Sequence, residues 1–214
     1  MPMTLHFHPL SSYCHKVLIA LYENAAPFTP LLVNLGDPAS REPFLKVWPV
    51  GKFPVIEDGD RVAPVSSIII EYLDQHYPGP TRLIPADPDL ARQCRMRDRF
   101  YDNHIHTHMQ KIVGDRIRPA DKKGIFGVEQ SRAAMKTALS MVDQEMASRT
   151  WAMCEDFTLA DCAAAPALFY ADKVMPFGND YKNASAYLSR LMARPSYARA
   201  LKEAEPFFQY FPQE

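Results

Sequence analysis

The sequence carries no excess of charge of either sign. Among its 214 residues, 24 lysines and arginines face 25 aspartates and glutamates, which leaves a formal net charge of −1. Surfaces that bind nucleic acid or anionic membranes are clearly basic. We therefore expect neither of these as the main partner.

Long apolar runs and targeting signals are also absent. No stretch approaches the ~20 apolar residues that cross a bilayer, and the first residues show no basic region followed by an apolar stretch. We therefore expect a cytoplasmic protein with no membrane partner. Hydrophobic residues still make up 47% of the chain, which is enough for a packed core.

Cysteine is scarce and forms no pattern. Neither metal-ligand spacing nor a disulfide framework is present among the four cysteines, Cys14, Cys94, Cys154 and Cys162. Reduced thiols in a cytoplasmic enzyme are the expected state. The histidines at 104, 106 and 108 invite a metal interpretation, but no third ligand of acidic or thiol character accompanies His104 and His108. We expect no metal.

The character of the chain changes near residue 88. Before it, extended stretches at 4–8, 28–33, 55–57 and 61–63 alternate with helical ones at 13–24, 40–45 and 66–77. Beyond it, only helical patterns are strong, at 88–113, 128–146, 158–171, 184–193 and 196–204. Prolines and glycine fill the stretch between. We predict an α/β domain at 1–77, a linker at 78–87 and an all-helical domain at 88–214.

One short stretch joins the first strand to the first helix, Ser11-Ser12-Tyr13-Cys14-His15-Lys16. Small hydroxyl residues at such a helix start are typical of an N-terminus that faces an anion. Ser11 and Cys14 also have the spacing of a Cys-x-x-Cys redox motif whose first cysteine is serine. Because the exposed nucleophile of that motif is missing, Cys14 is expected to be buried rather than reactive.

Three more segments stand out, at 51–55 (Gly-Lys-Phe-Pro-Val), 66–73 (Ser-Ser-Ile-Ile-Ile-Glu-Tyr-Leu) and 157–161 (Phe-Thr-Leu-Ala-Asp). In the last of them Thr158 and Asp161 form a capping box, which we favour over a catalytic role for Asp161. The stretch at 11–16, called the serine turn, and these three motifs have an order and spacing that resemble those of the cytosolic glutathione transferases. The resemblance covers essentially the whole chain. It implies a thioredoxin-like α/β domain followed by an all-α helical bundle, and a homodimer.

The resemblance also implies glutathione as co-substrate. Ser11 would be the catalytic residue, whose hydroxyl donates a hydrogen bond to the glutathione sulfur and favours the nucleophilic thiolate. Two alternatives stay open: Tyr13 as the donor, and a purely capping role for Ser11 or Ser12. The glutathione-binding residues that the resemblance implies are Ser12, Lys52, Phe53, Pro54, Val65, Ser66 and Ser67.

Within that set, Lys52 would take the glycyl carboxylate, Phe53 would pair its backbone with the cysteinyl residue, and Ser66 would take the γ-glutamyl carboxylate. Val65 departs from the family pattern, which has Glu or Gln at this position to receive the γ-glutamyl amine. A valine side chain cannot accept a hydrogen bond. The amine would then be met elsewhere, for example by Asp98 or Asp102 of a second subunit, or glutathione would bind more weakly.

The second substrate is expected between the domains. The residues predicted to line its pocket share one face of a helix or belong to the serine turn: Tyr13, Tyr101, Ile105, His108, Met109 and Ile112. The aromatic tail at 207–212 is expected to pack as a terminus or to cover this pocket. The predicted function is transfer of glutathione to a small apolar electrophile, as in detoxification. The alternatives are a non-catalytic interaction module and a glutathione-dependent reductase or isomerase.

Overall fold

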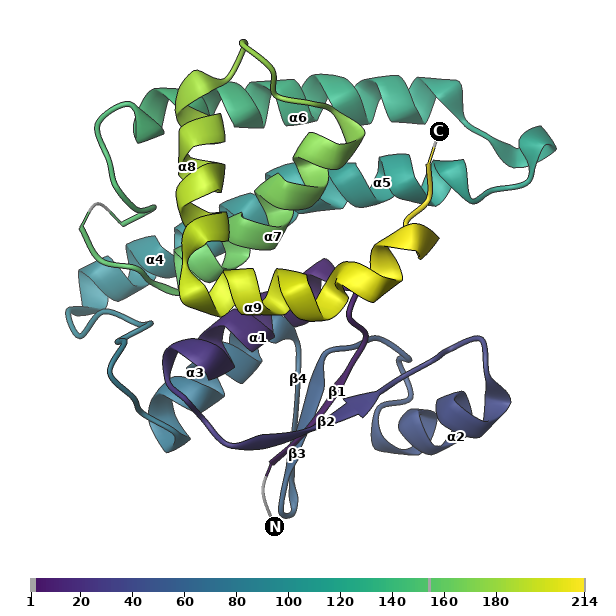
Figure 1. Cartoon of the computed structure of the whole chain (residues 1–214), viewed down its shortest axis with the longest axis vertical. Helices are drawn as coiled ribbons and strands as arrows, with labels where there is room; N and C mark the ends of the chain where they lie inside the picture. The colour runs from purple at the N-terminus through teal and green to yellow at the C-terminus, as the bar shows by residue number, and fades with distance from the viewer. Residues whose placement is uncertain (1–2, 154, 214) are drawn as a thin grey trace.

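The computed structural model describes residues 3–153 and 155–213. They form two lobes, one built on a sheet and one helical (Figure 1). Cys154, one of the four cysteines considered above, lies outside the described residues.

The sheet has four strands, β1 (Met3–Phe7), β2 (Phe28–Leu32), β3 (Val55–Asp58) and β4 (Arg61–Pro64), in the order β2-β1-β3-β4. β1 runs parallel to β2 and antiparallel to β3, and β3 forms the predicted hairpin with β4. A parallel pair needs a crossover connection, which α1 (Ser12–Glu23) supplies. The mixed sheet with this helix confirms the predicted thioredoxin-like domain.

The two faces of the sheet are covered by different helices. α1 and α3 (Ser66–His76) share the main hydrophobic core with Leu5 and Ile56, whereas α2 (Pro38–Val47) places Phe44 against Val33 and Val55 in a separate cluster. α2 begins earlier than the sequence pattern indicated. Asp37, ahead of Pro38, accepts a hydrogen bond from the Ala39 N–H at 3.0 Å and caps the helix.

The helical lobe follows an irregular stretch at 77–87. It contains α4 (Pro88–Phe100), a π-helical turn η1 (Tyr101–His106), α5 (Thr107–Arg116), α6 (Ile125–Met146), α7 (Leu159–Val174), α8 (Lys182–Ala193) and α9 (Pro195–Ala204). Short 3₁₀ turns η2 (Ala120–Lys122) and η3 (Glu205–Tyr210) complete it. The stretch predicted as one long helical pattern, 88–113, is helical throughout, and the π-helical turn η1 divides it into α4 and α5. Among the described residues, none of these helices has the length and apolar character to cross a membrane.

α7 is the centre of the lobe, and nearly all of its residues are buried. Its start shows the predicted capping box: the Thr158 hydroxyl accepts from the Ala160 N–H, and Asp161 accepts from the Thr158 N–H at 2.9 Å. Tyr187 also donates to Asp161, at 2.5 Å. These bonds hold Asp161 in a structural position.

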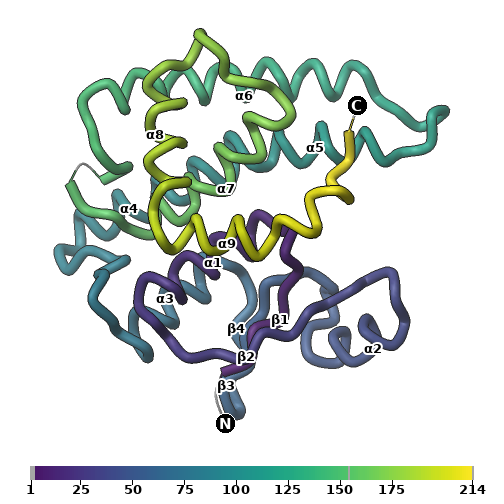
Figure 2. The backbone as a smooth tube through the Cα atoms, viewed as in Figure 1, coloured from purple at the N-terminus to yellow at the C-terminus, as the bar shows by residue number. Residues whose placement is uncertain are grey.

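α1 and α7 pack against each other and join the lobes into one core. α9 lies along the boundary between the lobes, beside α1, and the described chain beyond it runs toward α5 (Figure 2). A hydrogen bond from Arg116 Nη1 to the Pro212 carbonyl, at 3.1 Å, fixes that end against α5. Phe211 and Pro212 line one cavity together with Ser11 and Ser12, at the start of α1.

Candidate functional site

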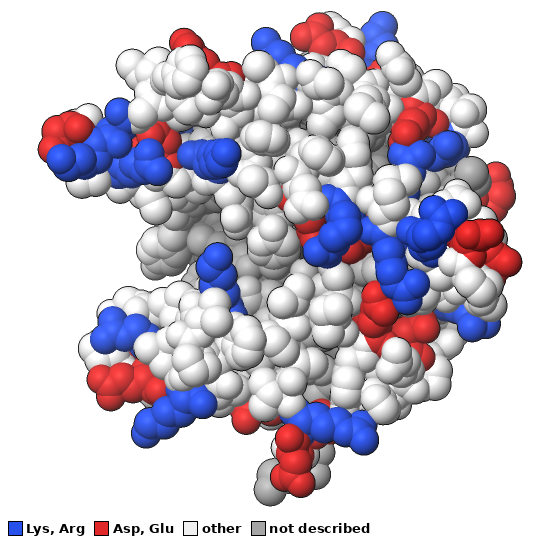
Figure 3. All heavy atoms as spheres, turned by 180° about the vertical axis from the view of Figure 1, so that it is seen from behind, with Lys and Arg blue, Asp and Glu red and all other residues white. Residues whose placement is uncertain are grey.

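Two adjoining cavities lie at the boundary between the lobes. Seen from behind, the surface is hollowed between the two lobes at the left edge of the molecule (Figure 3). The first cavity, of about 390 Å³, is called the Ser11 pocket and is lined by His8, Leu10, Ser11, Ser12, Phe53, Met109, Gln110, Val113, Gly114, Tyr170, Phe211 and Pro212. The second, of about 240 Å³, is called the Lys52 pocket and is lined by Tyr13, Trp48, Val50, Lys52, Phe53, Pro54, Val65, Ser66, Arg99, Asp102 and Asn103. Phe53 belongs to both, so one ligand can span them.

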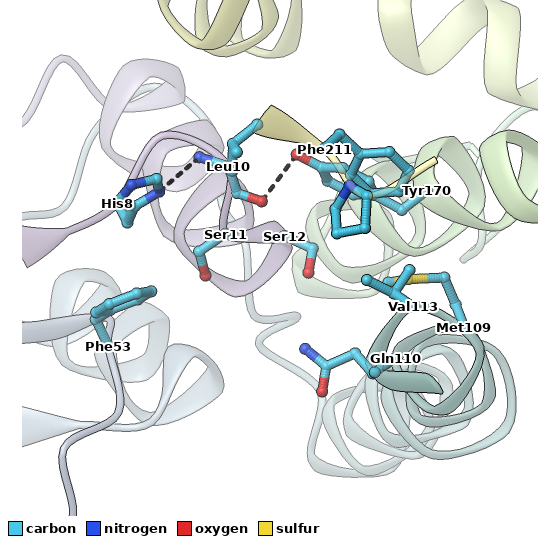
Figure 4. Close-up of a pocket in the computed structure, with 12 residues that line it drawn as sticks. His8, Leu10, Ser11, Ser12, Phe53, Met109, Gln110, Val113, Tyr170 and Phe211 are labelled. Carbon is cyan, nitrogen blue, oxygen red and sulfur yellow. Dashed lines mark hydrogen bonds between the residues drawn. The ribbon is translucent and has the colours of Figure 1, made fainter. Parts of the chain in front are cut away.

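Ser11 stands at the N-terminus of α1 as its cap. Its backbone is extended, with φ of −77° and ψ of 116°, and its Oγ accepts a hydrogen bond from the Cys14 N–H at 3.3 Å. The side chain is partly exposed in the space between Phe53 and Gln110 (Figure 4). A group bound there meets a hydroxyl and the positive end of the α1 dipole together.

Ser12 differs from Ser11 because its hydroxyl is already engaged. The residue is 5% exposed, and its Oγ lies 2.5 Å from Nε2 of His106, in η1. Burial and the charge of Lys16 lower the pKa of His106 to about 3, so the ring is neutral at physiological pH. Ser11 is therefore the hydroxyl that remains accessible at the start of α1.

Tyr13 turns away from the Ser11 pocket and lines the Lys52 pocket. Its ring centroid lies 4.0 Å from that of His106. Burial, with the nearby charge of Asp102, raises the pKa of Tyr13 to about 12, so the phenol stays protonated at neutral pH. The sequence prediction placed Tyr13 beside the second substrate, whereas the structure places it in the lining of the Lys52 pocket.

Cys14 is fully buried, one turn into α1. Burial raises the pKa of its thiol to about 12, although a hydrogen bond from Ser11 acts in the opposite direction. Because only the thiolate is a nucleophile, Cys14 has the inert character expected of a packed residue. A disulfide-exchange site at this turn is not supported.

The Lys52 pocket gathers the segments around β3 and the start of α3. The Phe53–Pro54 peptide bond is cis, Lys52 is exposed at the rim, and Ser66 is buried in the first turn of α3. No side chain caps α3, so its first N–H groups lie open toward the pocket. Val65 precedes them, 52% exposed and with φ of 71°, a left-handed conformation that a β-branched residue rarely adopts.

A buried group of charges lies behind this pocket, and we call it the Lys16 cluster: Lys16, Ser67, Asp98, Arg99 and Asp102. Lys16 Nζ donates to Ser67 Oγ at 2.8 Å and to Asp102 Oδ2 at 2.9 Å, and it also pairs with Asp98. Arg99 Nη2 contacts Asp98, Asp102 and Ser67. The cluster ties α1, α3 and α4 together, and Asp102 and Arg99 belong to the pocket lining as well.

The two halves of the chain match two domain families. Residues 5–81 match the family described as glutathione S-transferase, N-terminal domain, and residues 101–195 match glutathione S-transferase, C-terminal domain. The chain belongs to the glutathione S-transferase family.

Solved glutathione S-transferases share its whole fold. One from Methylobacillus flagellatus, with glutathione bound, is 27% identical, with a TM-score of 0.85 over 92% of this chain and 98% of the other. One from Methylobacterium radiotolerans, in complex with glutathione sulfonate, is 26% identical, with a TM-score of 0.81 over 94% of both chains. Among curated relatives, a stringent starvation protein A homolog of Coxiella burnetii is 28% identical over 95% of this chain and 93% of its own length.

In this member of the family, the predicted second-substrate residues separate into two groups. Met109 lines the Ser11 pocket. Tyr101, Ile105 and Ile112 are at most 2% exposed and belong to the core, because η1 and α5 pack their apolar stripe against α7. His108 lines a different cavity, near Lys111. These four residues do not line the Ser11 pocket.

The predicted glutathione-binding residues are brought together more completely. Lys52, Phe53, Pro54, Val65 and Ser66 line the Lys52 pocket, and Ser12 lines the neighbouring one. Ser67 lines neither pocket, because its hydroxyl is engaged within the Lys16 cluster.

Several pocket residues were missed by the sequence analysis. Val113 lies one helical turn beyond Met109 and shares its helix face, so the predicted position of Met109 could have indicated Val113 as well. Tyr170, at the end of the buried stretch of α7, donates from its hydroxyl to the Leu10 carbonyl at 2.9 Å (Figure 4). The ring centroids of Phe211 and Tyr170 lie 5.5 Å apart, so the aromatic tail closes one side of the pocket.

The three neighbouring histidines do not converge. His106 faces Ser12, His108 lines another cavity, and His104 lies against Phe100. Within residues 3–153 and 155–213, no group of three or more histidine, cysteine, aspartate or glutamate side chains is arranged to hold a metal ion.

Proposed function

We propose that this protein is a glutathione transferase in which Ser11 holds the glutathione sulfur as a thiolate. The thiolate attacks a small apolar electrophile and forms a carbon–sulfur bond, and the leaving group departs with the electron pair of the broken bond. Ser11 acts by donating a hydrogen bond to the sulfur, while the N-terminus of α1 favours its negative charge.

The shared wall of the two pockets carries this proposal. Phe53 lines both, so a peptide whose cysteinyl backbone lies along Phe53 places its charged ends in the Lys52 pocket and its sulfur beside Ser11. The remaining Ser11 pocket, with Met109, Val113 and Phe211, is apolar and suits the electrophile.

The required stabilisation is modest. A free thiol has a pKa near ~8.5, so a few per cent is thiolate at neutral pH. Lowering that pKa by one unit takes about 1.4 kcal/mol. A hydrogen bond to a charged acceptor contributes about 1.5–3 kcal/mol, which is enough for Ser11 alone to account for the shift.

A glutathione-transferase-like protein without catalysis is the second candidate. Val65, where the family pattern has Glu or Gln, favours it, and so does the similarity to a relative named as a stringent starvation protein homolog rather than as an enzyme. A glutathione-dependent reductase or isomerase remains a third. For a reductase that uses its own thiol, the buried and neutral Cys14 is a poor nucleophile.

We also propose a homodimer of cytoplasmic location. Glu71 of α3 pairs with Arg95 of α4 at 2.8 Å, and the adjoining Ile68 and Met96 are 53% and 52% exposed. Apolar residues exposed together on neighbouring helices suit an interface. Light scattering after gel filtration is expected to give twice the chain mass, and a single-chain mass would contradict the dimer.

Titration calorimetry and a conjugation assay test the function together. Glutathione is expected to bind, and a chlorodinitrobenzene is expected to be conjugated with release of chloride. Ser11→Ala is expected to lower the turnover ~10–100-fold with little change in glutathione affinity, whereas Ser11→Thr, which keeps the hydroxyl, retains turnover. Binding without conjugation of any of several electrophile classes would favour the interaction module.

A further inference from the structure

The Lys52 pocket contains one carboxylate among the lining residues that the structure describes, and it belongs to Asp102. Val65, also in the lining, offers no acceptor. Among the described residues of this chain, Asp102 is therefore the carboxylate that an ammonium group bound in this pocket can meet.

Asp102 is held in place by hydrogen bonds and can still accept another. It is 5% exposed, and its Oδ2 receives hydrogen bonds from Lys16 Nζ at 2.9 Å and Arg99 Nη2 at 2.8 Å. Its Oδ1 makes no hydrogen bond with any described residue. A carboxylate has about four acceptor positions, so a further donor can be accommodated. Burial also raises the pKa of Asp102, which an added cation would counteract.

Arg99 supplies the opposite charge in the same place. Its Nε and Nη2 are bonded within the Lys16 cluster, while Nη1 has no hydrogen bond to the described part of the chain. Arg99 Nη2 and Lys16 Nζ both bond Ser67, in the first turn of α3. The uncapped start of α3, with the buried Ser66, therefore lies beside this arginine.

A carboxylate acceptor next to a guanidinium and an open helix N-terminus matches an α-amino acid in its zwitterionic form. We propose that Asp102 and Arg99 of a single chain bind the α-amino-acid end of a γ-glutamyl thiol, Asp102 taking the ammonium group and Arg99 with Ser66 taking the carboxylate. This rests on the proposed function, and it deepens it: the amine contact that residue 65 cannot make is supplied within the subunit.

The site differs from the sequence-based expectation of a carboxylate from a second subunit. Asp98 is 1% exposed, is bonded within the cluster and lines neither pocket. Asp102 faces the pocket of its own chain. The proposed contacts to the amino-acid end therefore come from the same chain that forms the pocket.

A pair of ligands tests the inference by calorimetry. Glutathione is compared with glutaryl-cysteinylglycine, which lacks only the amino group. Wild-type protein is expected to bind glutathione at least ~10-fold more tightly, because a hydrogen bond to a charged group is lost with the analogue. In Asp102→Asn this preference is expected to disappear, and in Asp102→Glu, which keeps the charge, it is expected to persist.

The controls separate this role from a structural one. Asp98→Asn removes a carboxylate from the same cluster but not from the pocket, so it is expected to keep the preference for the amino group. Val65→Glu in the Asp102→Asn background is expected to restore it, which would not follow if Asp102 only stabilised the fold.

Equal binding of both ligands by the wild type overturns the inference while leaving the proposed function intact. That comparison needs no variant, so instability of Asp102→Asn does not prevent the test. An undiminished preference in a folded Asp102→Asn protein also overturns it. Failure of the wild type to bind either ligand overturns the proposed function, and the inference with it.

Discussion

Ser12 Oγ and His106 Nε2 lie 2.5 Å apart, one at the start of α1 and the other at the end of the π-helical turn. A parallel contact joins Lys16 and Asp102, each four residues away from a member of the first pair. In a helix, residues four apart share a face. The two contacts therefore dock one face of η1 onto one face of α1, and they set both the serine turn and the pocket carboxylate.

The buried His106 makes folding sensitive to acid. Its pKa is about 3 in the folded protein, against about 6.5 in the unfolded chain, so the unfolded state binds the extra proton. The contribution of His106 to stability is therefore present above pH ~6.5 and is lost as the pH falls toward the folded pKa. Between pH 7.5 and 5.5 this residue is expected to remove about 1.4 kcal/mol from the free energy of unfolding.

His106→Gln isolates that contribution in urea titrations at the two pH values. Glutamine preserves a polar group near the Ser12 hydroxyl but does not titrate. The variant is expected to lose about 1.4 kcal/mol less than the wild type over the same pH change. His15 is present in both proteins, and burial lowers its pKa to about 4. Its contribution to the loss of stability in acid is therefore the same in the wild type and the variant. Identical losses would show that His106 is not buried as a neutral ring.

Val65 strains the backbone where it precedes α3. A β-branched residue at φ of 71° costs about 1–3 kcal/mol, whereas glycine adopts this region freely at an entropic cost of about 0.5–1 kcal/mol. Val65→Gly is expected to raise the free energy of unfolding by about 1 kcal/mol and the melting temperature by about 2–4 °C. Calorimetric melting checks this. Val62→Gly, in strand β4 and without a positive φ, is the control and is expected to lower stability.

Phe211 is expected to contribute to binding of the second substrate. Its ring closes the Ser11 pocket beside Tyr170, so Phe211→Ala removes apolar contact with an electrophile. The KM for an aromatic electrophile is expected to rise about 3–10-fold, while glutathione affinity is unchanged. Phe208→Ala, in the same tail but outside the pocket lining, is the comparison, and its electrophile KM is expected to stay within about twofold of the wild type. An equal effect of both variants would point to the tail as a whole.

The elements with local signals were predictable from the sequence. The hairpin at Asp58–Arg61, the capping box at Thr158 and the helix start after Ser11 each depend on a few adjacent residues. Family resemblance added the order of the motifs, and the segments around Lys52 and Ser66 do meet in one pocket.

The sequence did not determine which face of the helix beyond residue 100 packs into the core and which lines a pocket. Tyr101, Ile105 and Ile112 form an apolar stripe, and such a stripe has the same pattern whether it faces a core or a pocket. The π-helical turn leaves no mark in the hydrophobic pattern, and the contacts that its residues Asp102 and His106 make, with Lys16 and Ser12, join residues far apart in the sequence. Pocket residues from distant elements, such as Tyr170 and Phe211, depend on the same packing.

The thiol pKa of bound glutathione reports whether Ser11 stabilises the thiolate. Thiolate absorbance is titrated against pH with saturating glutathione in the wild type, in Ser11→Ala and in Ser11→Thr. The wild type and Ser11→Thr are expected to give a pKa at least one unit below the value of about 8.5 for a free thiol, and Ser11→Ala a pKa near that value. The same pKa in the wild type and Ser11→Ala would show that Ser11 does not stabilise the thiolate.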